Sequence, residues 1–232
     1  MDSSSEAPER SNQMLNRLRA AVLGANDGVV SVSGVVMGVA GATTNQGAIA
    51  TAGLAALVAG ALSMAVGEYV SVSSQSDTEK AYIEKERASL KAHPREEYEE
   101  LVENYKKRGV SDATAHQVAK ELSSKNPLKA HLEVEFGLDE NDINSPSQAA
   151  IASLVSFTVG GLIPFLAILL APTAARIPTT VVAVAVALLV TGYYSAHVGG
   201  ASKVRAVARV LVGGLLAMTI TYFVGVLFGA KV

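Results

Sequence analysis

The sequence predicts an all-α, polytopic membrane protein with five transmembrane helices and a cytosolic helical domain inserted between the second and third. Half of its 232 residues are apolar and only 17% are charged, which is unusually apolar for a water-soluble domain of this length. The apolar residues gather in five stretches, each long enough to cross the ~30 Å hydrocarbon core of a bilayer as a helix. Almost all charged residues lie before residue 20, between 77 and 144, or in short connections.

The five stretches cover residues 20–41, 48–71, 149–171, 177–196 and roughly 206–230. They divide the chain into a cytosolic N-terminal segment (1–19), the first two spans (20–76), the charged insert (77–144) and the last three spans (145–232). A signal peptide at 15–42 is an alternative, because basic residues precede an apolar stretch there. Asn26 and Asp27 interrupt that stretch, and it is long for a signal peptide, which favours a membrane span.

Basic residues in the short flanks predict the orientation. Arg10, Arg17 and Arg19 precede the first span, and Lys203, Arg205 and Arg209 lie between the fourth and the fifth, whereas the opposite flanks hold only Arg176 and Lys231. Because Lys and Arg favour the cytosolic side, the N-terminus, the insert and the 197–205 link are predicted to be cytosolic, and the C-terminus is predicted to lie outside.

The insert reads as about four short helices, because apolar residues recur at helical spacing between Pro94, Gly109, Pro127 and Gly137. Its first helix is expected to continue the second span, since nothing between Gly67 and Leu90 would stop it. The insert holds sixteen Asp/Glu and eleven Lys/Arg, a net charge of −5. Such an acidic segment favours cations over nucleic acid as partners.

Two acidic residues lie within otherwise apolar spans. Asp27 is about 10 Å inside the first span, and Glu68 lies just before the cytosolic end of the antiparallel second span, so both fall at a similar depth. A carboxylate in the bilayer costs at least ~2.5 kcal/mol and normally faces a partner or a wet path. Met64 is one turn from Glu68 on the same face. These three residues are predicted to form a transport site for Fe(II), Mn(II) or Co(II), where protons and cations exchange.

Each of these residues also has a plainer interpretation. Asp27 would cap a helix that begins near Gly28, but only about 14 apolar residues would then remain, too few to span. A helix end at the lipid headgroups tolerates an acid such as Glu68. Met64 by itself is more typical of core packing.

The insert contains further candidate ligands. Its glutamates are dense on the first, second and last predicted helices, and Glu79, Glu103 and His131 are candidate ligands among them. The alternative is a solvated charged face in which glutamates alternate with lysines.

Several kinds of site are excluded or disfavoured. The sequence has no Cys, which excludes disulfides, thiolate zinc sites and iron–sulfur clusters. It has no P-loop motif and no Glu-x-x-His pair. No nucleophile, base and orienting group come together in the sequence, so we expect no enzyme activity and no prosthetic group. Any metal is therefore expected as substrate.

The strings GANDGVVSVSGVVMGVAGA and ALSMAVGEYVSVSSQSDTEKAYIEKER resemble those of the vacuolar iron transporter family. The resemblance continues through the insert and the string FTVGGLIPFLAILL. It implies a homodimeric exporter of cytosolic Fe(II) in exchange for protons, with Mn(II) as a further candidate substrate and a pathway along the dimer axis. The pathway residues that it implies are Asp27, Met64 and Glu68. The metal-binding glutamates that it implies in the insert are Glu86, Glu97, Glu100 and Glu135.

The chain departs from the family pattern at two positions. Ser89 stands one turn after Glu86, where the family pattern has another acid, so one ligand is expected to be lost. Phe157 stands near the start of the third span, where we expect a tyrosine facing the pathway. The resemblance therefore predicts an intact membrane site and an altered cytosolic one.

The hypothesis from the sequence is a proton-coupled antiporter in a homodimer, and small residues support close helix packing of this kind. Gly53, Gly60 and Gly67 recur every seven residues in the second span. The alternatives are a manganese or cobalt exporter for which iron is incidental, and a metal-sensing scaffold that transports nothing; Zn(II) is a further possible substrate. The lack of Cys and of a targeting extension suits a bacterial inner membrane, although a vacuolar membrane would give the same topology.

Overall fold

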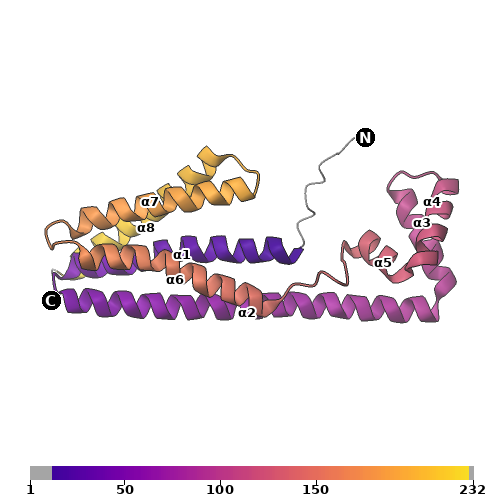
Figure 1. Ribbon diagram of the computed structural model, residues 1–232, viewed down its shortest axis with the longest axis horizontal. Helices are drawn as coiled ribbons and strands as arrows, with labels where there is room; N and C mark the ends of the chain where they lie inside the picture. Colours follow the sequence, from indigo (N-terminus) through magenta and orange to yellow (C-terminus); the bar gives the residue numbers. More distant parts are fainter. Residues whose placement is uncertain (1–11, 230–232) are drawn as a thin grey trace, which may run out of the picture. The chain divides into compact units, whose positions relative to one another are not determined.

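A computed structural model describes residues 12–229, and every regular element in that range is a helix (Figure 1). Residues 1–11, including Arg10, and residues 230–232, including Lys231, lie outside the described residues. The elements in chain order are α1 (Asn12–Ala42), α2 (Gln46–Ala92), α3 (Pro94–Lys107), α4 (Asp112–Lys125), α5 (Pro127–His131), the π-helix η1 (Leu132–Phe136), α6 (Pro146–Leu170), α7 (Arg176–Val198) and α8 (Lys203–Gly229).

The chain divides into two compact units. Within the described residues, the membrane unit comprises 15–70 and 146–229, and the Glu-rich unit comprises 12–14 and 71–145. Five helices are long and apolar enough to cross a membrane, namely α1, α2, α6, α7 and α8, which confirms the five predicted spans. Because α2 is one unbroken helix of 47 residues, the prediction that the second span continues into the insert is also confirmed.

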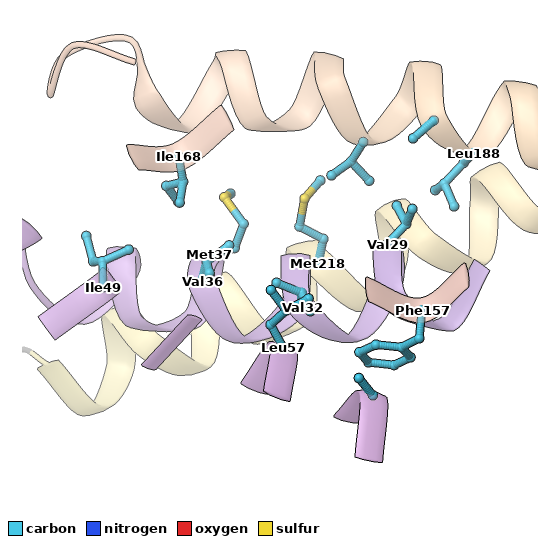
Figure 2. Packing of buried hydrophobic residues seen from close by; sticks show 13 residues of the cluster. Val29, Val32, Val36, Met37, Ile49, Leu57, Phe157, Ile168, Leu188 and Met218 are labelled. Atoms are coloured by element: carbon cyan, nitrogen blue, oxygen red, sulfur yellow. The ribbon is translucent and has the colours of Figure 1, made fainter. Parts of the chain in front are cut away.

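All five spans contribute to one apolar core in the membrane unit (Figure 2). Helix α1 supplies three fully buried valines, and each of the other spans adds at least one large side chain. The labelled residues of this core are Val29, Val32, Val36, Met37, Ile49, Leu57, Phe157, Ile168, Leu188 and Met218. Lipid is as apolar as these side chains, so close packing rather than escape from water holds the spans together.

Small residues bring α1 into backbone contact with α6 and α8. A Cβ atom at Gly160 would lie 2.2 Å from the carbonyl oxygen of Ala25, and one at Gly225 would lie 1.8 Å from that of Gly38. Neither distance leaves room for a methyl group. The glycines that recur in α2 have different surroundings. Gly60 faces the ring of Phe157, whereas Gly67 has open space beside it.

Helix α1 decides between two interpretations of Asp27. The helix begins at Asn12, so Asp27 lies in its middle and the helix-cap alternative is wrong.

Phe157, which stands where we expected a tyrosine, is 1% exposed and packs in the core of the membrane unit. Its ring therefore fills space between helices within one chain.

The Glu-rich unit has a small core of its own. Leu101, Val102, Ala115, Ala119 and Ala130 are buried together where α3, α4 and α5 meet. Prolines occupy the first turns of α3 and α5, where a missing N–H is harmless. Gly109 and Gly137 follow α3 and η1 with φ angles of 91° and 64°, which favour glycine. The predicted punctuation of the insert is thus confirmed.

The close helix contacts lead to a stability prediction. Gly160→Ala should force α6 away from α1 and destabilise the protein by about 1–3 kcal/mol, seen as a lower midpoint of thermal unfolding in detergent. Gly213→Ala on α8 is the matched control, because a Cβ there meets nothing within 4 Å. Equal midpoints for the two variants would contradict the proposed packing.

Candidate metal sites

The Glu-rich unit brings three carboxylates, from α2, α3 and η1, together around the imidazole of His131 on α5. The Nδ1 atom of His131 lies 3.1 Å from Glu86 Oε1, 3.6 Å from Glu97 Oε2 and 3.0 Å from Glu135 Oε1. One ligand atom each from Glu86, Glu97 and His131 lie within 4.8 Å of one another, and all three residues are buried. Three carboxylates and a nitrogen form a donor set that suits a borderline divalent cation.

Neighbouring polar groups hold the carboxylates in place. The hydroxyl of Ser89 donates to Glu97, and Asn104 Nδ2 donates to Glu135 Oε1 at 3.2 Å. Glu86 Oε1 is buried and forms no well-aligned hydrogen bond among the described residues, although His131 Nδ1 lies 3.1 Å from it. A buried acceptor without a well-formed hydrogen bond is costly, which makes this oxygen a candidate ligand for a cation.

Negative charge exceeds positive charge in this cluster. Burial, and then the charge of Glu135, raise the pKa of Glu86 from 4.5 to about 7, while His131 opposes that shift. Burial also raises the pKa of Glu135, to which the charge of Glu100 contributes. A single imidazole cannot neutralise three carboxylates, so the cluster favours bound protons or a bound metal ion.

The other predicted ligands of the insert lie outside the cluster. Glu100 is exposed and influences it through its charge on Glu135. Glu79 accepts a hydrogen bond from Gln75, and Glu103 pairs with Lys106 at 3.4 Å. Ser89, which replaces an acid expected from the family pattern, orients a glutamate here.

In the membrane unit, the three predicted pathway residues have separate environments. Asp27 Oδ1 accepts a hydrogen bond from the hydroxyl of Ser31 at 2.8 Å. Glu68 is only 6% exposed, and its Oε2 pairs with Arg19 Nη2 at 2.9 Å. Met64 packs against the apolar core. Among residues 12–229, no hydrogen bond or ion pair joins Asp27 to Glu68.

Asp27 is half-buried on a stripe of α1 whose other members are exposed. Leu23 and Val35 on that face are 45% and 39% exposed, and Ser31 is exposed between them. These residues follow one another at intervals of four, so they form one stripe along the helix. A carboxylate facing lipid is unfavourable, which indicates that the stripe faces water or another chain.

Sequence reasoning missed the pairing role of Arg19, which it treated only as a basic flank residue. The sequence carries no signal for this pairing, because Glu68 is 49 residues away on another helix. The central place of His131 was also underestimated, because its neighbours come from three other elements.

The comparisons with known proteins agree with one another. A family model described as the VIT family matches residues 18–226. A vacuolar iron transporter from Acanthamoeba castellanii is 44% identical over 211 residues, which cover 90% of this chain and 78% of that protein. The vacuolar iron transporter homolog 1 of Oryza sativa subsp. japonica is 40% identical, covering 91% of this chain and 74% of its own. The vacuolar iron transporter homolog 2 of Arabidopsis thaliana is 36% identical, with 91% and 84% covered.

The raised pKa of Glu86 predicts a pH-dependent stability of the metal-free protein. The folded state keeps the Glu86 proton up to about pH 7, whereas the unfolded chain loses it near 4.5. The stabilisation that protonated Glu86 adds to the free energy of unfolding is therefore complete below pH 4.5 and is lost as the pH rises through 7. This loss amounts to at most about 3 kcal/mol.

Glu86→Gln should flatten this dependence and raise the thermal midpoint at about pH 8 in the presence of a chelator. Glu84→Gln, on the same helix and 71% exposed, is the control and should behave like the wild type. If Glu86→Gln leaves the slope between about pH 5 and pH 8 unchanged, the electrostatic description of the cluster is wrong.

The geometry also predicts that His131 contributes to metal binding. His131→Leu keeps a side chain of similar size but removes the nitrogen ligand. The Mn(II) affinity of the purified protein should therefore fall roughly tenfold or more in a calorimetric titration. His116→Leu is the matched control, because His116 is 43% exposed and its ring lies beside Tyr98, outside the cluster. Equal Mn(II) affinities in the two variants would show that His131 is not a ligand of the site.

Proposed function

The chain belongs to the VIT family, and on that premise we propose that it is a proton-coupled antiporter that exports cytosolic Fe(II), and also Mn(II). It is a multi-pass membrane protein of a metal-ion transporter family. One observation carries the proposal: three buried or half-buried glutamates surround a single imidazole, which leaves a ready-made site for a divalent cation.

In this proposal the Glu-rich unit is cytosolic and collects the ion. The acidic charge of the insert and the basic flanks of the spans support that orientation. The ion then passes to Asp27, Met64 and Glu68, where oxygen and thioether groups suit Fe(II) or Mn(II). Protons from the far side bind the carboxylates and release the ion outward. The same ligands would admit Co(II) and Zn(II) as weaker substrates.

A homodimer would complete the pathway. The partly exposed stripe of α1 carries Asp27 and Ser31, which are unfavourable in contact with lipid. Two copies that face each other along this stripe would enclose it, and the acids of both chains would then line one path. This arrangement also explains why one chain by itself gives Asp27 and Glu68 separate partners. Either a bacterial inner membrane, which we favour, or a vacuolar membrane would support this mechanism.

Two rival functions make different predictions. In a manganese or cobalt exporter, iron would be a poor competitor for the preferred ion. In a metal-sensing scaffold, the Glu86, Glu97 and His131 cluster would bind metal but the protein would move none. Flux in liposomes with Fe(II), Mn(II), Co(II) and Zn(II), each with and without a pH gradient, distinguishes these functions from the proposed one.

Asp27→Asn should reduce proton-driven Fe(II) flux by about 100-fold, because the site loses a charge that both the metal and the proton require. Asp77→Asn is the matched control, since Asp77 is exposed in the Glu-rich unit, and its flux should equal that of the wild type. Wild-type flux in the Asp27→Asn variant would disprove the mechanism. Flux that does not depend on the pH gradient would be consistent with metal transport but would exclude proton coupling.

A further inference from the structure

Glu68 is the most deeply buried acid of the membrane unit, and an arginine of the same chain already occupies it. Only 6% of Glu68 is exposed, whereas the side chain of Arg19 is 53% exposed. The guanidinium therefore lies between the buried carboxylate and the outside of the unit. Asn16 holds it there, because Asn16 Oδ1 accepts hydrogen bonds from Arg19 Nε at 3.2 Å and Nη2 at 3.0 Å.

Charge counting shows why this ion pair matters for a cation site. Glu68 carries one negative charge and Arg19 one positive charge, so the pair has no net charge. A divalent ion bound to Glu68 beside Arg19 would give this group a net charge of +2, which is unfavourable at low dielectric. Withdrawal of the guanidinium removes this repulsion and frees Glu68 for the ion.

Withdrawal is sterically open. Arg19 lines a cavity of about 420 Å³ at the α1 and α7 side of the membrane unit, with Leu15, Leu23 and Ser195 among its walls. Its exposed guanidinium can also turn toward water, where an arginine loses little free energy. Glu68 has no comparable freedom, because it is buried.

We propose that Arg19 is a tethered counter-ion that occupies Glu68 in the absence of metal, is displaced by the entering divalent cation, and returns to expel it. This inference rests on the proposed function and adds to it a residue that sets affinity. Removal of Arg19 leaves an uncompensated buried carboxylate, which binds cations more tightly. The same removal slows release, because only protons then compete with the ion for Glu68.

Arg19→Gln in the full-length protein should lower the KM for Mn(II) in proteoliposome flux by about fivefold or more and should lower kcat as well. A merely structural role would reduce the folded fraction or raise KM, and it would not lower KM. Arg19→Lys, which keeps the charge but loses the planar fork, should give an intermediate KM. Arg17→Gln is the matched control, because Arg17 is exposed and no ion pair is found for it among the described residues, and its KM should not change.

If Arg19→Gln does not fold, Asn16→Ala provides the second test, since it frees the guanidinium and should lower KM by about twofold. An unchanged or raised KM in a folded Arg19→Gln protein, or in Asn16→Ala, overturns the proposal. Glu68→Gln separates this failure from a failure of the proposed function. Loss of flux in Glu68→Gln together with an unchanged KM in Arg19→Gln rejects only the counter-ion. Normal flux in Glu68→Gln rejects the transport site itself.

Discussion

A buried carboxylate must be neutralised, and this constraint governs both units of the protein. In the membrane unit, Arg19 neutralises Glu68 directly at 2.9 Å. In the Glu-rich unit, one imidazole faces Glu86, Glu97 and Glu135, so neutralisation is incomplete without protons or a cation. At low dielectric each uncompensated charge raises the free energy of the folded protein. Binding of a divalent ion would relieve that unfavourable free energy and would therefore be favoured. The two sites thus differ in whether the protein supplies the counter-charge itself.

The scaffold keeps these charges in place by two kinds of packing. In the membrane unit, glycines such as Gly160 and Gly225 let helix backbones touch, which compensates for the absence of a hydrophobic drive between spans. In the Glu-rich unit, a small apolar core fixes α3, α4 and α5, and the carboxylates gather beside it. Both arrangements leave acids buried at some expense of stability, as is common where a site must bind and release a ligand.

Hydropathy was sufficient for the five spans, because each needs about 20 apolar residues whatever its neighbours are. The helix ends of the insert could be predicted from proline and glycine, such as Pro94 and Gly137, because these residues act through local backbone geometry. The acids of the insert were harder to rank. Glu103 and Glu97 lie on different faces of α3, and Glu79 is two turns from Glu86, so neither joins the cluster. Only the packing of four elements reveals which glutamates face His131.

The sequence by itself determined the all-helical class, the number of spans, the acidic insert and the presence of acids at membrane depth. These features follow from local composition and helical periodicity. The tertiary structure decided that His131 is the centre of the Glu-rich cluster, that Glu68 is paired with Arg19, and that Asp27 is half-buried on a partly exposed stripe of α1. Those facts depend on distances between residues up to 49 positions apart, and such distances arise only when helices pack.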